Sequence, residues 1–227
     1  MLKISLIPLV ALLVPTMLSA KPGRATLTAK KPQAKEVNEI LSGYRKAKAI
    51  QAKIKKTVVQ EAMGTETKGQ GEFYFSKGKL RMDLQSPEKS TLVYDGKVIW
   101  FESQIEGFDG GPATVQVTKM KMGKLRKTDS LLATLFEEKD ILKNFKLISS
   151  KTTKPGMNTF VFEPSDKSKT EVQQLEIGTK NKNIDRIAYR DQVANKVSFE
   201  FSDLKKGAVP AAKFKYVVPK KAEVTEL

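Results

Sequence analysis

Serine–lysine pairs and paired carboxylates are the arrangements in this sequence that could perform catalysis, by nucleophilic attack or by glycosidase-type acid–base chemistry. Many other sites are excluded, because the 227 residues include neither cysteine nor histidine. The chain therefore has no disulfide, no thiolate or histidine metal site, no catalytic thiol, no Ser-His-Asp triad and no lipidated N-terminal cysteine.

The serines, lysines and carboxylates that are present do not recur at a spacing that catalysis needs. Neither a Walker loop nor a GxSxG elbow occurs. Asp95-Gly96 is typical of a turn, and Glu137-Glu138 of an exposed helix face. We therefore predict no catalytic residue, no metal site and no cofactor. The sequence favours a binding or structural module, and a hydrolase that uses Ser-Lys or carboxylates is the weakest alternative.

Residues 1–20 have the pattern of a secretory signal peptide. Lys3 supplies the positive start, Ile4 to Leu18 is nearly all apolar, and Ser19-Ala20 offers small residues for cleavage. A signal anchor is the alternative, but Pro8 and Pro15 interrupt an apolar run that is already short for a bilayer span. We expect an exported protein that acts in the periplasm.

Basic residues outnumber acidic ones, 41 to 25, and they concentrate near the start of the chain. Eleven basic and two acidic residues give residues 21–60 a net charge of +9, whereas residues 61–227 carry +6. Only six of the basic residues are arginine and they are not interleaved with aromatics, which argues against nucleic acid as a partner. We interpret the charge as a solvated lysine-rich surface, with weak attraction to anionic lipid head groups as the alternative.

The remaining chain is expected to form one domain over residues 34–227, preceded by a flexible basic lead over residues 21–33 that lacks periodicity. From Ile50 to Val58 apolar and polar residues mostly alternate, so this stretch is either a strand or a longer helix. The β-branched residues at 57–59 favour the strand. A helix is predicted from Ala34, because apolar residues then recur at 3.6-residue spacing: Val37, Ile40, Leu41 and Tyr44.

A second helix is predicted after Thr128-Asp129-Ser130, whose side-chain oxygens can cap it. Turns are predicted at Lys77-Gly78 and at Asp95-Gly96, the latter as a tight hairpin in which both central residues take positive φ. The apolar face of the second helix is expected to comprise Leu131, Leu132, Leu135 and Phe136, continued by Ile141, Leu142 and Phe145.

The rest of the chain reads as short strands separated by turns rich in glycine, asparagine, proline and lysine. We expect about ten or eleven antiparallel strands in one sheet. A sheet of that size should curl or close, and its concave face must be filled by side chains, helices or a ligand. Beyond the first ambiguous stretch, the predicted strands cover 72–75, 80–84, 91–94, 98–101, 115–120, 145–150, 159–163, 172–178, 184–190, 196–201 and 214–218.

Three blocks of sequence are more specific than these patterns. They are Gly69 to Phe75, continued by Leu80-Arg81-Met82; Ser90 to Phe101; and Gly207 to Phe214, followed by Pro219. In their order and spacing, the blocks resemble the family of outer-membrane lipoprotein carriers, LolA. The resemblance extends over nearly all of the chain after the signal peptide.

The resemblance implies a mainly β (α+β) fold, in which a single curved antiparallel sheet forms an incomplete β-barrel with a helical lid over an apolar cavity. It implies a periplasmic chaperone that takes triacylated lipoproteins from an inner-membrane ABC exporter. The carrier shields the acyl chains and passes them to an outer-membrane acceptor protein or to the anionic outer-membrane surface. The resemblance implies no cofactor, and we expect a monomer.

A carrier of acyl chains needs apolar walls that are not fully packed, because each buried methylene group contributes about 0.8 kcal/mol. For any single residue, ordinary core packing is the alternative role. The wall candidates are Phe73, Phe75, Leu80, Met82, Leu92, Trp100, Phe160, Phe162, Phe199 and Phe201, and the lid candidates are Leu131, Leu132, Leu135 and Phe136.

Lys77 is the candidate latch for the lid. The family usually has a basic residue there, commonly arginine, which hydrogen-bonds toward the lid and is followed by proline. Here Lys77 keeps the charge without the planar donor fork of arginine, and Gly78 loosens the turn, so we expect weaker closure. Leu80 and Met82 occupy positions where aromatic residues are common, which predicts a flexible apolar chamber.

The main alternative function is a binding module on the same scaffold that senses envelope lipid or lipoprotein and regulates stress signalling. Such sensors usually carry a second domain, and no second domain is indicated by this sequence.

Overall fold

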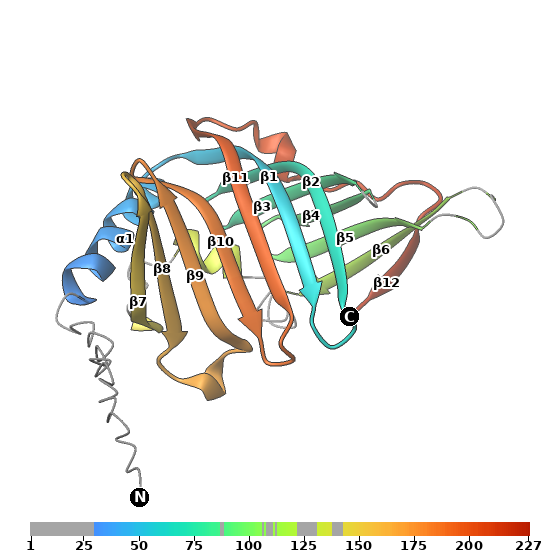
Figure 1. The fold of residues 1–227 in the computed structure, drawn as a ribbon. Coiled ribbons are helices and arrows are strands. Elements are labelled where there is room, and N and C mark those ends of the chain that lie inside the picture. Colours follow the sequence, from blue (N-terminus) through green and yellow to red (C-terminus); the bar gives the residue numbers. More distant parts are fainter. Residues whose placement is uncertain are drawn as a thin grey trace, which may run out of the picture.

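The computed structural model describes residues 30–86, 89–105, 113–121, 131–137 and 143–227, together with positions 107 and 111. The predicted signal peptide, residues 21–29 of the lead, the Thr128-Asp129-Ser130 cap, Ile141 and Leu142 lie outside these ranges. Over the described residues, twelve strands form one sheet in the order β12-β6-β5-β4-β3-β2-β1-β11-β10-β9-β8-β7 (Figure 1).

The elements follow one another in the chain as α1 (Lys30–Arg45), β1 (Ala49–Gln60), β2 (Thr65–Ser76), β3 (Lys79–Ser86), β4 (Ser90–Tyr94), β5 (Val98–Ile105), β6 (Thr114–Lys121), α2 (Leu131–Glu137), β7 (Phe145–Lys154), β8 (Met157–Pro164), the short 3-10 helix η5 (Lys167–Lys169), β9 (Val172–Lys180), β10 (Asn183–Asp191), β11 (Lys196–Gly207), the 3-10 helix η6 (Ala211–Phe214) and β12 (Glu223–Glu226).

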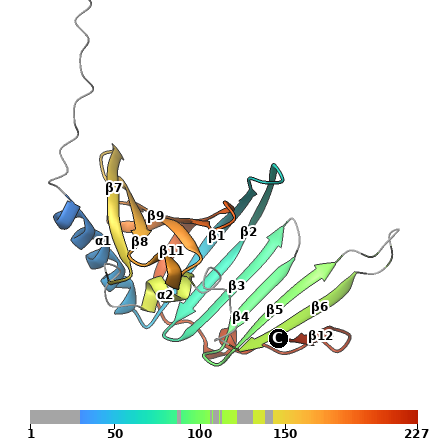
Figure 2. The same ribbon diagram turned by 90° about the horizontal axis from the view of Figure 1, so that it is seen from below.

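The sheet is curved and does not close, because β7 and β12 are separate edges with no pairing between them. Figure 2 shows α2 inside the curve and α1 at the end that carries β7. Closely packed residues join α1 to β7, β10 and α2. The predicted fold class, a single curved sheet that forms an incomplete barrel, is confirmed.

The helix α1 begins at Lys30 instead of Ala34, so the last four residues of the predicted lead form its first turn. A proline at position 32 is compatible with this, because the first N–H groups of a helix have no intrahelical acceptor. The predicted apolar face is present, and all four of its residues are buried in the core: Val37, Ile40, Leu41 and Tyr44.

Tyr44 fastens α1 to the sheet through its hydroxyl group. The hydroxyl accepts a hydrogen bond from the Ile184 N–H at 3.1 Å and donates to Asn183 Oδ1 at 3.3 Å. Burial raises the pKa of Tyr44, partly offset by the hydrogen bond from Ile184, so the hydroxyl keeps its proton at neutral pH.

Replacing Tyr44 with phenylalanine should therefore lower the free energy of unfolding by about 1–3 kcal/mol, because the buried Ile184 N–H loses its acceptor. The ring contacts with Phe136 and Lys206 should survive in this variant. Urea unfolding of the two proteins measures the difference. An unchanged unfolding midpoint would show that water replaces the hydroxyl.

The stretch from Ile50 to Val58, which could have been either helix or strand, lies within the strand β1, as the β-branched residues at 57–59 indicated. β1 pairs with β2 on one side and with β11 on the other. Its alternation places Ile50, Ala52 and Ile54 in the core, whereas Lys53 and Lys55 are exposed on the outer face.

The hairpin between β4 and β5 differs from the prediction. Only Gly96 has a positive φ (101°), whereas Asp95 does not. Asp95 Oδ1 instead accepts hydrogen bonds from the N–H groups of Lys97 and Val98 at 2.8 and 2.9 Å. The aspartate thus stabilises a three-residue loop from its first position, and the turn needs one left-handed residue rather than two.

The prediction of a strand over 214–218 is wrong. Phe214 ends η6 and is buried, and the next residues join no strand of the sheet. The segment instead crosses the outer face: Tyr216 stacks on Trp100 with ring centroids 5.3 Å apart, and the Arg81 guanidinium donates to the Lys213 carbonyl at 3.2 Å. The preceding strand β11 already pairs with β1 and β10, so this segment cannot pair with β11 as the next strand of a hairpin.

After η6 the chain rejoins the sheet at β12, which pairs in parallel with β6. This strand was not predicted. The strand has four residues, all exposed, so it carries no apolar alternation that could reveal it. Phe145 was assigned both to the face of the second helix and to the predicted strand over 145–150. It begins β7, so the strand assignment is confirmed and the helical one is wrong.

None of the helices in the described part of the chain has the length and apolar character that crossing a membrane requires.

Candidate functional site

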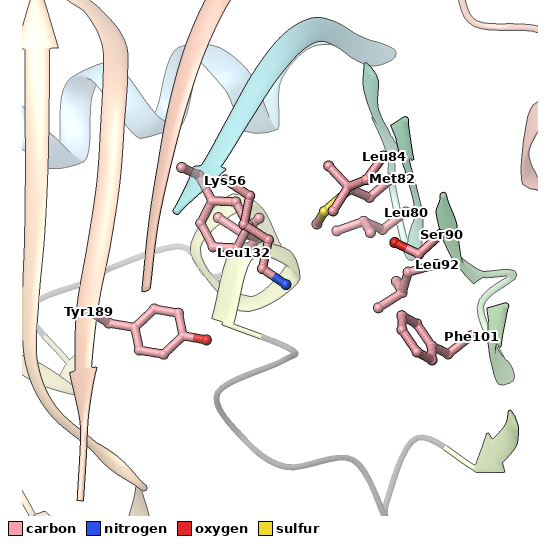
Figure 3. A pocket seen from close by; sticks show the side chains of 10 residues that line it. Lys56, Leu80, Met82, Leu84, Ser90, Leu92, Phe101, Leu132 and Tyr189 are labelled. Atoms are coloured by element: carbon pink, nitrogen blue, oxygen red, sulfur yellow. The ribbon is translucent and has the colours of Figure 1, made fainter. Parts of the chain in front are cut away.

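A pocket opens on the concave face of the sheet, between β3, β4 and β5 on one side and β1, β10 and β11 on the other (Figure 3). Its empty volume is about 640 Å³, including the part that opens to solvent. The helix α2 contributes Leu132 to its wall. The lining residues are Lys56, Leu80, Met82, Leu84, Ser90, Leu92, Leu132, Phe101, Tyr189 and Phe199.

Strand register explains how these side chains meet. Met82 lies opposite Phe73 on β2 and opposite Leu92 on β4, and Leu92 lies opposite Phe101 on β5. Directly paired residues project from the same face of a sheet, so this row forms a continuous apolar strip across four strands. The strip supplies one wall of the pocket.

The predicted wall residues divide into three groups. Leu80, Met82, Leu92 and Phe199 line the open pocket, and Leu80, Met82 and Phe199 also belong to the buried core. The next five are aromatic residues that are buried in that core and do not line the pocket: Phe73, Phe75, Phe160, Phe162 and Phe201. The concave face is thus partly filled by protein side chains and partly open.

Trp100 is the third case, and its assignment to the cavity wall is corrected by the structure. It lies opposite Val93 and Lys119, and therefore on the face away from the row that contains Leu92 and Phe101. Its ring stacks on Tyr216, and the Lys119 ammonium lies 5.5 Å from its centroid. Trp100 therefore anchors the C-terminal segment to the outer face.

The predicted lid residues all lie in one place. Leu131, Leu132, Leu135 and Phe136 are buried at 4% exposure or less and belong to the same core as the wall aromatics.

Phe136 is the centre of the contact between α2 and the sheet. Its ring centroid lies 5.3 Å from that of Phe75, 5.9 Å from that of Phe73 and 5.9 Å from that of Tyr44 on α1. Aromatic pairs at these distances add stabilisation beyond area burial. The helix α2 therefore covers an aromatic floor, which is formed by Phe73 and Phe75 of β2. The pocket begins where this cover ends.

Lys77 lies exposed at the turn between β2 and β3. Within the described ranges, no hydrogen bond or ion pair joins its side chain to another residue. The adjoining Gly78 has φ of 69°, a conformation that proline cannot adopt, which explains the departure from the family pattern at this position. The contact that holds α2 in the described residues is the Phe136 cluster.

Five pocket residues were not among the predicted wall positions: Lys56, Leu84, Ser90, Phe101 and Tyr189. Two-residue alternation could have added Leu84 after Leu80 and Met82, because all three share one face of β3. Lys56 could not be found in this way, because a lysine breaks the apolar pattern of β1.

The electrostatic character of the pocket is simple. Among the described residues that line it, none is acidic and Lys56 alone is charged. Among the described residues, no group of three potential metal ligands comes together. The arrangement can bind an apolar ligand and present one cation to it.

Comparison with known proteins agrees with this geometry. The profile of the family described as outer membrane lipoprotein carrier protein LolA matches residues 45–217, which run from the end of α1 to beyond η6. The outer-membrane lipoprotein carrier protein of Cupriavidus pinatubonensis is 29% identical over 158 residues, which are 68% of this chain and 68% of that protein. The protein of the same name from Bordetella pertussis is 25% identical over 181 residues, 79% of this chain and 81% of that protein.

Among solved structures, an uncharacterised conserved protein from Thermus thermophilus aligns over 86% of this chain and 99% of its own, with a TM-score of 0.49 and 13% identity. The matched family is one of carriers rather than of enzymes. Because its profile covers well over half of the sequence, this chain belongs to the outer-membrane lipoprotein carrier protein LolA family.

Proposed function

We propose that this protein is a periplasmic carrier that binds the acyl chains of triacylated lipoproteins in the pocket beside α2. It receives them from an inner-membrane ABC exporter and delivers them to an outer-membrane acceptor protein or to the anionic outer-membrane surface. The observation that carries the proposal is an open apolar pocket on the concave face, in a chain of the LolA family. The N-terminal pattern over residues 1–20 supports export to the periplasm.

The division of the concave face suits such a task. The strip through Met82, Leu92 and Phe101 removes methylene groups from water, and each contributes about 0.8 kcal/mol. The side chains of α2 cover the aromatic floor, so that the empty protein exposes less apolar surface. A cover that must be displaced lowers the apparent affinity for ligand, which helps the acceptor to remove the cargo.

The proposal can be tested by release of a triacylated lipoprotein from spheroplasts into the soluble fraction. We expect Phe101→Glu to reduce release at least tenfold, because acyl chains that lie along the apolar strip would remove water from the new carboxylate. Phe101 is 39% exposed in the empty protein, so the substitution should leave folding intact. Val217→Glu is the matched control, because Val217 is 82% exposed and lies outside the pocket.

Release by Phe101→Glu at the wild-type level would contradict the pocket assignment. Mass spectrometry of lipids that copurify with the native protein tests the cargo itself. Acylated peptides support the carrier, whereas free glycolipid without acylated peptides would favour a lipid-sensing module.

A further inference from the structure

One cation projects into the apolar pocket from β1. Lys56 lies opposite Gly69 on β2 and Phe199 on β11, and Phe199 also lines the pocket. On β1 it continues the inward row of Ile50, Ala52 and Ile54, whereas its neighbour Lys55 is exposed on the outer face. Alternation therefore places Lys56 on the concave side.

Two hydroxyl groups share the pocket with this ammonium group. Figure 3 shows the Lys56 amine and the Tyr189 hydroxyl both pointing into the space, from β1 and β10 respectively. Ser90 supplies a second hydroxyl from β4, on the far wall beside Leu92. The other seven lining side chains that belong to the described part of the chain are apolar, and none of these seven is acidic.

A lysine in such surroundings has a specific chemical consequence. An ammonium group offers three hydrogen-bond donors, so it can bind an arriving oxygen in addition to a partner within the protein. A bound hydrocarbon would remove water from this cation and return no acceptor, which is costly. An acyl chain that ends in a carbonyl or carboxylate oxygen would replace that water while its methylene groups lie along the apolar strip.

We infer that Lys56, with the Tyr189 hydroxyl on the same side of the pocket, anchors the oxygen-bearing head of an acyl ligand and so determines how deeply the chain enters the pocket. This inference rests on the proposed function and names the polar part of its ligand. The shared chemistry is an acyl chain with an oxygen acceptor at its head. The acceptor comes either from the ester and amide carbonyls of a lipidated cysteine or from the carboxylate of a free fatty acid.

The experiment compares Lys56→Met with wild type against three probes: a synthetic triacylated lipopeptide, a fluorescent fatty acid and a pyrene-labelled alkane that has no oxygen. Lys55→Met is the matched control, since it removes the same charge from the adjacent residue on the opposite face. We expect Lys56→Met to weaken binding of an oxygen-bearing probe about tenfold and to leave alkane binding unchanged or tighter. Lys55→Met should bind all three as wild type does.

The pattern of losses identifies the ligand. A loss for the lipopeptide alone assigns Lys56 to the carbonyls of a lipidated cysteine, and a loss for the fatty acid alone assigns it to a free carboxylate. Equal affinity of Lys56→Met and wild type for both oxygen-bearing probes, or an equal loss for the alkane, would overturn the inference. Lys56→Gln, which keeps a neutral donor of similar length, replaces the methionine variant should that protein unfold more readily than wild type.

Failure of the proposed function gives a different result. A wild-type protein that binds the fatty acid but not the lipopeptide would overturn the carrier role. Comparing Lys56→Met with wild type for fatty-acid binding would still test the role of Lys56. A wild-type protein that binds none of the probes would overturn both.

Discussion

Replacing Phe136 with alanine is expected to lower the free energy of unfolding by about 3–5 kcal/mol and to uncover the aromatic floor of the concave face. Phe136 is 1% exposed and contacts the rings of Phe73, Phe75 and Tyr44. It is the largest side chain that α2 places against the sheet. Without it, the described side chains that hold the seven-residue helix in place are its leucines.

Two measurements separate loss of stability from loss of the cover. Urea unfolding gives the change in free energy, and the fluorescence of a dye that binds exposed apolar surface reports opening in the native state. We expect the dye signal to rise in Phe136→Ala under conditions where the protein is still folded. A rise in ligand affinity should accompany it, because less cover must be displaced.

Phe160→Ala is the matched control for this prediction. Phe160 is also 1% exposed but belongs to β8, where it lies opposite Ser150 and Ile177. Its loss should cost a similar free energy without raising the dye signal of the native protein. Equal dye binding by the two variants would show that α2 is ordinary core and not a cover.

Replacing Gly71 with alanine is expected to cost about 3 kcal/mol of stability, through overpacking against the backbone of β3. A Cβ atom at Gly71 would lie 1.8 Å from the Asp83 carbonyl oxygen, so the two strands would have to separate. Gly71 stands at a register shift between β2 and β3, where the backbones approach closely. This close approach explains why a glycine is needed in the block from Gly69 to Phe75.

The same change should also weaken ligand binding, because β3 carries Leu80, Met82 and Leu84 into the pocket. Gly207→Ala is the control, since a Cβ atom there would meet nothing within 4 Å. Thermal unfolding and lipopeptide titration of both variants provide the measurements. Wild-type stability in Gly71→Ala would mean that the pairing of β2 with β3 adjusts without cost.

The position of the pocket follows from an uneven filling of one curved sheet. At the end that carries β7 to β9, the helix α1 and side chains such as Phe160 and Phe162 fill the concave face. Toward β3, β4 and β5 the helices do not complete the cover, so the apolar strip borders the open pocket. On the proposed function, an acyl ligand would use the open part directly and would enlarge it by displacing α2.

Alternation and turn chemistry predicted much of the fold. Strands β3, β4, β8 and β10 were found within a few residues of their bounds, because each is a short stretch with apolar or aromatic residues between turn residues. The same reasoning failed for residues 214–218, whose alternating Phe214, Tyr216 and Val218 resemble a strand. These residues follow β11, which already pairs with β1 and β10, and the pairing of β11 depends on the whole topology.

The site was predicted less completely than the fold. The buried face of α2, which carries the four predicted lid residues, was found because its apolar residues recur at helical spacing. Trp100 was misplaced, because both faces of β5 carry apolar residues. Alternation separates Trp100 from Phe101 but does not say which of them points inward. Lys56 was missed because its position in the pocket depends on apolar side chains that other strands and α2 supply.

The sequence by itself determined the absence of cysteine and histidine chemistry, the large curled sheet and the family, because composition, two-residue periodicity and local motifs are properties of short stretches of chain. The tertiary structure decided which apolar residues are packed and which border open space. That distinction depends on how far α1 and α2 extend over the sheet, and periodicity assigns a side chain only to a face. Phe75 and Leu92 both point inward, yet Phe136 covers the first and the second faces the pocket.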